Sequence, residues 1–338
     1  MIGMDMQIIS LNDKKKWNEY VFNHKDSIAW HCYEWSEIVG KHYDVEFYPL
    51  AAIDGEYVKG ILPLYMVNGM LVSVAYAVAG GILADDRDVE RSLLNKSIEM
   101  ANSKNIKKIV FKQYKNSIDA DLSTDENYYN KELDLTDSIE NIRNNFGQFN
   151  RKILDGMNEL DYSLDFSSEN IDIFYKMLFN HSHKQGIPCP AKNWIHDLIN
   201  FKMYKIGILK KGNSILSGTL IKEFKSTVSF PFTCFPGNKK NMNNVYYLYW
   251  MLIKKFAGDG LTVFHSGRIP KTDETNRYRL GWGGIPFNYY YQYYPKESGN
   301  TEYGAKRGLK RKIFNTVWKI TPGSITKFFN DKITAKFP

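Results

Sequence analysis

Three arginines lie in a glycine-rich segment near the end of the chain, residues 267–284. They are Arg268, Arg277 and Arg279. The segment directly follows a short apolar run that predicts a buried strand. A guanidinium in such a loop can grip a carboxylate or a phosphate through two parallel N–H donors. The alternative is that the arginines form salt bridges within the loop, with Asp273 and Glu274.

A second anion-binding signal is the segment 236–241, Pro-Gly-Asn-Lys-Lys-Asn. Gly237 allows the backbone to approach a ligand, Lys239 and Lys240 supply charge, and a helix-length segment begins at Asn243. The N–H groups at the start of a helix attract anions. The alternative is a solvated turn before a helix.

The histidines give weaker signals. His181, His183 and Cys189 have a spacing that metal ligands can have. No further Cys or acidic residue stands at ligand spacing, so no metal is predicted. His265, at the end of a predicted strand, is either a proton acceptor or a structural residue.

These residues belong to a unit that occurs twice in the chain. From Ile206 to Arg268 the order is β-hairpin, strand, polar glycine loop, helix and strand. The same order is found from Tyr48 to Gln113, with Gly55 opposite Gly212 and Gly60 opposite Gly218. We therefore expect a divergent duplication that produces two similar α/β lobes.

The segments around these two copies have weaker patterns. Helices are predicted in the N-terminal segment to about residue 48, at 138–158 (which includes Arg143, Arg151 and Lys152), at 170–185 and at 194–201. Residues 287–294 predict an aromatic strand. Residues 124–134 are polar and predict a linker or an irregular edge.

Composition restricts the class of protein. The chain has 338 residues, 43% of them hydrophobic and 24% charged, so it can bury a core. Its three cysteines are odd in number and far apart, which favours a reducing compartment over a disulfide framework. Neither a signal peptide nor a membrane span is recognisable, and we expect a cytoplasmic protein.

The net charge of +8 resides in the C-terminal segment 303–338, where nine Lys and Arg face one acid, Asp331. Apolar and aromatic residues alternate with these cations. Such a segment either lies on the inner, anionic face of a membrane, where each basic residue contributes about 1 kcal/mol, or packs on its own domain. Nucleic acid is disfavoured because the remaining 302 residues are neutral in total.

Four further signatures resemble the FemAB (FemABX-like) branch of the GNAT acyltransferase superfamily, over about residues 30–300. They are Gly80–Asp86; His183–Ile187; Asn244–Trp250 followed by Gly260; and Gly267-Arg268 with Tyr278-Arg279 and Trp282-Gly283. The tail is similar to those of FemAB-like proteins found with exopolysaccharide systems. The resemblance implies an α/β (α+β) fold with two tandem GNAT-like lobes, each a mixed, mostly antiparallel twisted sheet flanked by helices. We expect an N-terminal lobe at 1–135, a C-terminal lobe carrying the site at 136–300, and a basic amphipathic tail at 301–338.

The resemblance also implies an activity. Family members transfer an acyl group from a carrier thioester, such as acyl-CoA, or from aminoacyl-tRNA to the amine of a cell-envelope precursor. The acceptor expected here is an amino-sugar or peptide precursor of the envelope or of a polysaccharide, either free or lipid-linked. The alternatives are an aminoacyl-tRNA-dependent peptidyltransferase of the peptidoglycan-bridge type and a non-catalytic, membrane-associated scaffold. No Ser-His-Asp or Cys-His constellation is evident in the sequence, which favours direct transfer without a covalent enzyme intermediate.

We assign site roles from the chemistry that such a transfer needs, namely a bound donor, an aligned neutral amine and a proton acceptor. Donor phosphate is expected at Gly237, Lys239, Lys240, Asn243 and Asn244, and the acidic acceptor or its diphosphate at Arg268 and Arg279. Tyr247 and Trp282 would shape the cleft, and His265 would accept a proton.

The chain also departs from the peptidoglycan-bridge pattern. Gln113 replaces an acid, Pro190 replaces an arginine with Lys192 nearby, Trp194 replaces a tyrosine, and Phe232 replaces a pocket tyrosine. Gln113, Lys192, Trp194 and Phe232 are candidates for substrate contact, and the lost polar groups favour an acceptor other than a muramyl-peptide nucleotide.

Overall fold

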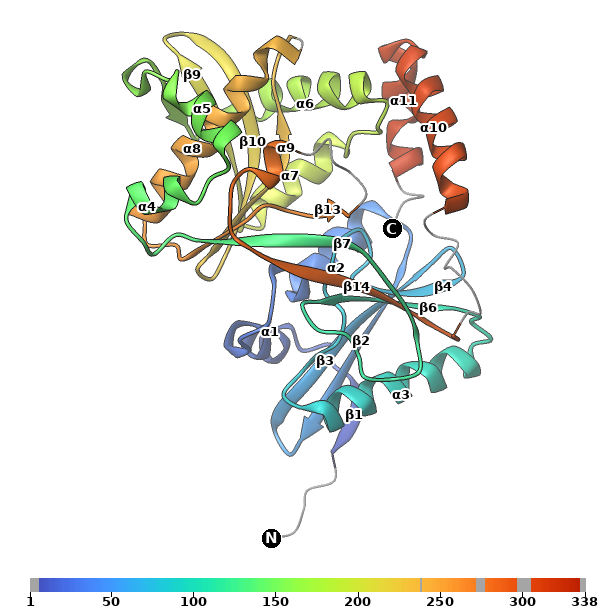
Figure 1. Cartoon of the computed structure of the whole chain (residues 1–338). Coiled ribbons are helices and arrows are strands. Elements are labelled where there is room, and N and C mark those ends of the chain that lie inside the picture. Colours follow the sequence, from blue (N-terminus) through green and yellow to red (C-terminus); the bar gives the residue numbers. More distant parts are fainter. Residues whose placement is uncertain (1–5, 238, 272–276, 297–304, 335–338) are drawn as a thin grey trace. The chain divides into compact units, whose positions relative to one another are not determined.

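The computed structural model of the chain describes residues 6–237, 239–271, 277–296 and 305–334. They form two compact units (Figure 1). Unit 1 contains residues 6–128 and 288–296, and unit 2 contains the described residues of 129–287 and 305–334. Strands β7 (Ser123–Asp134) and β14 (Ile285–Tyr294) each belong in part to both units.

Unit 1 is a mixed sheet with helices. Its strands are β1 (Gln7–Ser10), β2 (Glu46–Asp54), β3 (Tyr57–Val67), β4 (Met70–Ser73), β5 (Leu83–Ala84) and β6 (Ile109–Tyr114). Its helices are α1 (Lys14–Asn23), α2 (Tyr33–His42) and α3 (Arg87–Ser103), with a short 3₁₀ turn η1 (Ala29–His31). The strand order is β1-β2-β3-β4-β6, followed by β14 and β7, and β5 pairs with β3.

Unit 2 has a longer list of elements. Its strands are β8 (Ser163–Asp165), β9 (Tyr204–Lys211), β10 (Ser214–Phe224), β11 (Thr227–Cys234), β12 (Val263–His265) and β13 (Ile269–Pro270). Its helices are α4 (Ile139–Asn144), α5 (Gln148–Asp155), α6 (Ile171–Gln185), α7 (Lys192–Asn200), α8 (Asn243–Gly258), α9 (Arg277–Leu280), α10 (Ala305–Ile320) and α11 (Gly323–Thr334). Three 3₁₀ turns, η2 (Glu159–Asp161), η3 (Ser168–Asn170) and η4 (Lys239–Met242), complete it. The strand order is β8-β9-β10-β11-β12-β7, and β13 also pairs with β7.

The two units repeat one pattern, which confirms the predicted duplication. The order strand, two helices, three strands, helix, strand runs through β8 to β12, and β1 to β6 follow the same order with one additional short strand, β5, before α3. In each copy the first three pairings are antiparallel and the last is parallel. Gly55 and Gly212 lie in corresponding turns with φ of 59° and 55°, a conformation that favours glycine.

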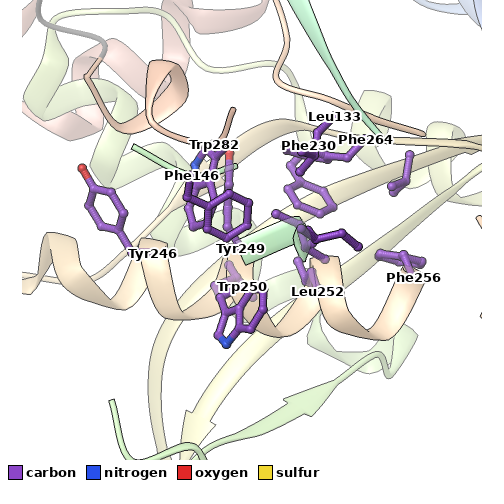
Figure 2. Packing of buried hydrophobic residues seen from close by; sticks show 14 of the residues in the cluster. Leu133, Phe146, Phe230, Tyr246, Tyr249, Trp250, Leu252, Phe256, Phe264 and Trp282 are labelled. Carbon is purple, nitrogen blue, oxygen red and sulfur yellow. The ribbon is translucent and has the colours of Figure 1, made fainter. Parts of the chain in front are cut away.

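Each unit has its own hydrophobic core. In unit 1, α3 packs on β2 and β3, and Leu93 and Phe111 are fully buried. In unit 2, α8 lies against β9, β10 and β11 and contributes Tyr249, Leu252 and Phe256 (Figure 2). The polar loops described below lie at the ends of elements that these cores hold in place.

The interpretation of residues 124–134 as a linker is wrong, because this segment is strand β7. Its sequence, Ser-Thr-Asp-Glu-Asn-Tyr-Tyr-Asn-Lys-Glu-Leu-Asp, is polar. β7 lies between β12 and β14 in the strand order, so its backbone groups are paired on both sides. Leu133 belongs to the core of unit 2 and is only 1% exposed.

The C-terminal segment forms two helices, α10 and α11, which both contact α6 (Figure 1). Trp318 of α10 and Thr326 and Asn330 of α11 are buried. Part of this segment therefore packs on its own unit. No helix in the described ranges is both long enough and apolar enough to span a membrane.

We expect Leu133→Ala to lower the free energy of unfolding by about 2–5 kcal/mol, because it leaves a cavity in a closed core. Urea denaturation followed by circular dichroism measures this loss. Asn127→Ala, at an exposed position of the same strand, is the control and should change stability by no more than about 0.5 kcal/mol. A Leu133→Ala protein as stable as the control would contradict the burial of β7.

Candidate functional site

The two arginines assigned to the acceptor lie beside each other in unit 2. Arg268 is exposed in the turn between β12 and β13, and Arg279 is partly buried in α9. The Arg279 guanidinium donates from Nη1 to the Arg268 carbonyl oxygen at 3.0 Å. Residues 272–276, which include Asp273 and Glu274, lie outside the described residues. The salt-bridge alternative therefore stays a prediction.

The residues that follow Arg279 are held in place from three sides. Lys131 of β7 donates from Nζ to the Leu280 carbonyl at 3.1 Å, and the Gly147 N–H donates to the Gly281 carbonyl at 2.8 Å. Trp282 is fully buried, with its ring 5.0 Å from that of Phe146 (Figure 2). Core packing thus sets the position of the α9 backbone and of Arg279.

Several buried polar atoms around this segment have no hydrogen-bond partner among the described residues. They are both amide atoms of Asn150, the indole Nε1 of Trp282 and the hydroxyl of Ser266. Asn150 is 1% exposed and lies directly against Gly281, where a Cβ atom would come within 2.2 Å of Asn150 Oδ1. Buried unpaired polar atoms are rare and costly, so their grouping indicates a functional constraint.

His265 is paired with an acid that the sequence analysis placed in a linker. Its Nε2 lies 2.9 Å from Glu132 Oε1, and the two residues are direct cross-strand partners. In the tautomer that carries its proton on Nε2, His265 donates this hydrogen bond to Glu132, and Nδ1 is the nitrogen that can accept a proton. The sequence did not indicate Glu132 as a site residue, because its relation to His265 depends on the pairing of β7 with β12 and not on the local sequence.

The His265–Glu132 pair continues a row of polar side chains across the sheet. Lys222 of β10 is the partner of Ser229 of β11, which is the partner of His265. Partners in adjacent strands point to the same face. Phe264 and Leu133, the strand neighbours of His265 and Glu132, belong to the core of unit 2. The sheet therefore has the α8 core on one face and this row on the other, the face on which α6 also packs.

Burial lowers the pKa of Lys222 to about 7, although the residue as a whole is partly exposed. An amine with such a pKa is partly neutral at physiological pH and can accept a proton. The sequence contains no local sign of this, because the cause is the surrounding packing.

The predicted phosphate loop is described on both sides of residue 238, which itself lies outside the described residues. Gly237 has φ of +88°, its carbonyl accepts from Lys184 Nζ at 2.8 Å, and Asn241 Nδ2 donates to the Pro236 carbonyl at 3.0 Å. Lys239 and Lys240 lie in η4, and their side chains are outside the described part of the chain.

Helix α8 follows this loop. Its N-cap, Met242, makes no side-chain capping hydrogen bond. Asn243 is exposed, and Asn244 accepts a hydrogen bond at its carbonyl from Ser217 Oγ at 2.9 Å. The assignment of donor phosphate to this loop and to the start of α8 stays a prediction.

Four candidate substrate contacts have partners within unit 2. The Tyr247 ring lies 5.3 Å from that of Tyr162, and burial followed by the charge of Tyr162 raises the pKa of Tyr247. The Phe232 carbonyl accepts from Thr219 Oγ1 at 3.0 Å. Trp194 is buried in α7, and Lys192 forms an ion pair with Asp172.

Gln113 lies in unit 1, on β6, and is 3% exposed. Its Oε1 accepts from the Ile82 N–H at 2.6 Å. A Cβ atom on Gly81 would lie 1.4 Å from the same oxygen. Gly81 of the Gly80–Asp86 signature is therefore needed to leave room for the Gln113 side chain. The side chain holds the chain that follows Gly81.

The three residues with metal-like spacing have separate partners. The His181 ring packs on Phe235 at 4.9 Å, and burial, followed by the charge of Lys184, lowers the pKa of His181. His183 Nε2 lies 2.8 Å from the Thr321 carbonyl, and Cys189 is buried. Within the described ranges, no group of three His, Cys, Asp or Glu residues is placed to hold a metal ion.

A basic cavity of about 340 Å³ lies on α4 and α5. It is lined by Arg143, Asn144, Gln148, Arg151, Lys152 and Asp155. Arg143 Nη2 is 2.5 Å from Asp155 Oδ1, and Arg151 Nη1 donates to the Asn144 carbonyl at 3.5 Å. The sequence indicated the basic helices, and their folding gathers the cations around one cavity.

Lys222→Met should stabilise the protein by about 1–3 kcal/mol at pH 6 and by less as the pH approaches 10.5. Between the folded pKa of about 7 and the ordinary value of 10.5, the unfolded chain binds the proton and the folded chain does not, so wild-type stability rises with pH. Urea denaturation of both proteins across this range measures the difference. Lys202→Met, at an exposed position, is the control. A gain in the free energy of unfolding that is the same at every pH would show that folding does not lower the pKa of Lys222.

Comparison with known proteins supports the fold. No protein-family model matches the chain, and no curated protein sequence does. FemX superposes with a TM-score of 0.69 at 11% identity, over 91% of this chain and 100% of that one. The C-terminal domain of a putative lysylphosphatidylglycerol synthetase from Agrobacterium fabrum gives 0.55 at 11% identity, over 90% and 96%.

A tandem GNAT protein from the clavulanic acid biosynthesis pathway gives a TM-score of 0.52 at 10% identity, over 88% of this chain and 100% of that one. At such identities the likeness concerns the fold. Together with the repeated pairing pattern, these neighbours confirm what the sequence resemblance implied: the chain has the FemAB-like fold of the GNAT superfamily, with two tandem GNAT-like lobes.

Proposed function

We propose that the protein is an N-acyltransferase that joins an acyl or aminoacyl group to the amine of a cell-envelope or polysaccharide precursor. The observation that carries the proposal is the arrangement at the end of β12. There, two residues separate His265, the partner of Glu132, from Arg268, and the Arg279 guanidinium donates to the Arg268 carbonyl. A base and two guanidinium groups in one short region suit the acylation of an amine on an anionic molecule.

The chemistry requires no covalent enzyme intermediate. The lone pair of the neutral acceptor amine attacks the carbonyl carbon of the donor, and a tetrahedral oxyanion forms. Collapse of this oxyanion expels the thiolate of the carrier and leaves an amide. The amine proton passes to Nδ1 of His265, whose Nε2–H is held by Glu132. Cys234 is a poor nucleophile, since burial raises the pKa of its thiol, and Cys32 and Cys189 are buried as well.

The preferred donor is an acyl-CoA or another acyl carrier thioester. Its phosphates would contact the loop of Gly237, Lys239 and Lys240 and the start of α8 at Asn243 and Asn244. Arg268 and Arg279 would grip the carboxylate or diphosphate of an amino-sugar or peptide acceptor. Tyr247, Trp282, Lys192, Trp194, Phe232 and Gln113 remain the proposed substrate contacts.

Arg268→Ala and Arg279→Ala should each lower kcat/KM about 10- to 100-fold, because each removes charge-assisted hydrogen bonds to the acceptor. Mass spectrometry of reactions between acetyl-CoA and amino-sugar nucleotides measures the transfer. The melting temperature should move by about 2 °C or less, since neither side chain lies in a core.

Arg91→Ala, at an exposed position of α3, is the matched control and should retain full activity. Unchanged transfer by either site variant would defeat the assignment. A wild-type protein that neither transfers acyl groups nor binds acyl carriers in calorimetry would favour the scaffold alternative.

A second candidate donor is aminoacyl-tRNA, and the basic cavity on α4 and α5 favours it. RNA phosphates are bound mainly by Lys and Arg, and Arg151 and Lys152 both line this cavity. α5 packs on α8, the helix that begins at the proposed phosphate loop (Figure 1). A bound tRNA could therefore contact both the cavity and the loop.

If tRNA is the donor, filter binding of charged tRNA should weaken steeply with salt, and Arg151→Ala with Lys152→Ala should reduce the salt slope by about 2. Lys15→Ala with Lys16→Ala, two exposed lysines of α1, is the matched control and should leave the slope unchanged. Equal slopes for both double variants would remove the cavity from the tRNA hypothesis.

A further inference from the structure

Helices α10 and α11 expose a set of large apolar side chains. The exposed residues are Ile313, Val317 and Ile320 of α10 and Ile325, Phe328 and Phe329 of α11. Ile320 is 75% exposed and Phe328 is 73% exposed. Side chains of this size are normally buried, and a contiguous set on a surface marks a binding face.

The exposed residues form one stripe on each helix. On α10 they are spaced by four and three residues, and on α11 by three and one, so each set lies on one side of its helix. The packed side is separate: Trp318 is 7% exposed, and Thr326 and Asn330 are each 1% exposed. Because folding already uses the other side, the apolar stripes are not required for the core of unit 2.

The two helices are firmly attached to the end of α6. The Thr321 carbonyl, in the turn between them, lies 2.8 Å from His183 Nε2, and Asn330 Oδ1 accepts from the Cys189 N–H at 2.8 Å. Gly186 leaves room for α10, because a Cβ atom there would lie 2.2 Å from the Asn315 carbonyl oxygen. The stripes are therefore presented by an anchored hairpin.

Charge selects the partner of this surface. Residues 303–338 contain nine Lys and Arg and one acid, and Lys319 and Lys327 are exposed in the described helices. Bulky apolar side chains among cations match the interface of an anionic bilayer, where the apolar groups enter the acyl boundary and the cations meet phosphate headgroups. A surface that binds another protein would instead be expected to have a polar rim around its apolar residues, with charges of both signs.

We propose that the α10–α11 hairpin docks unit 2 on the surface of an anionic phospholipid membrane. The hairpin and the proposed donor loop share the last turn of α6, since His183 contacts Thr321 and its neighbour Lys184 donates to the Gly237 carbonyl. Docking would thus hold the end of α6, which contacts the proposed donor loop at Gly237, on the membrane-bound hairpin. This last consequence rests on the proposed function; the docking itself does not.

The test is flotation of the full chain with vesicles of phosphatidylcholine alone or of phosphatidylcholine with phosphatidylglycerol. We expect binding to the vesicles that contain phosphatidylglycerol and at least tenfold weaker binding to the neutral ones. Ile320→Ser with Phe328→Ser should weaken binding more than tenfold, because both apolar contacts are lost. Lys319→Gln with Lys327→Gln should weaken it by up to about 25-fold, about fivefold for each charge, and added salt should reduce that difference.

Leu160→Ser with Ile285→Ser is the matched control, because these unit 2 side chains are 94% and 77% exposed and lie outside the hairpin. It should bind vesicles like wild type.

The melting temperature and the light scattering of every variant are measured alongside its vesicle binding. Equal binding by the hairpin variant and wild type, equal binding of wild type to both vesicle types, or no binding at all would overturn the proposal. A hairpin variant that changes only the mass in solution would assign the stripes to contact between copies. The flotation assay contains neither acyl donor nor acceptor, so its result does not depend on acyl transfer. A failure of docking can therefore be told apart from a failure of the proposed activity.

Discussion

The complete burial of Trp282 determines where the candidate site can be. The indole ring lies among Phe146, Tyr246 and Tyr249, so the turn between α4 and α5, helix α8 and the segment after α9 meet at one aromatic cluster (Figure 2). Moving this ring would open a large cavity at a cost of several kcal/mol, about 3–5 for loss of the side chain. Arg279, three residues earlier, therefore has a backbone position set by the core, and a charged group on a rigid frame binds with less loss of entropy.

The two faces of the sheet in unit 2 carry different kinds of side chain. One face carries Phe230, Phe264 and Leu133 against α8, and the other carries the row that ends in His265 and Glu132. Alternation along each strand produces this division, because successive side chains point to opposite faces. The polar row therefore takes no part in the core that α8 forms, although α6 packs on the same face.

The C-terminal helices extend the same unit with a different kind of surface. Their packed side is satisfied by the end of α6, through His183 and Cys189, and their other side is apolar and basic. The residues that had a metal-like spacing in the sequence are thus partly explained by contact with this hairpin. An envelope acyltransferase with a membrane-facing hairpin would meet a lipid-linked acceptor in two dimensions, which raises the effective concentration of that acceptor.

Local sequence was sufficient for the repeated fold. Glycine turns, β-rich runs and a helix-length segment recur in order, and each is a short-range signal, so both copies of the GNAT-like pattern and the helices α3, α6 and α8 were predictable. The tertiary structure alone decided the role of β7, since a polar strand is stabilised by pairing on both sides rather than by its own residues. For the same reason the partnership of His265 with Glu132, 133 residues apart, and the lowered pKa of Lys222 could not be predicted. They arise from strand register and burial, which only the folded chain defines.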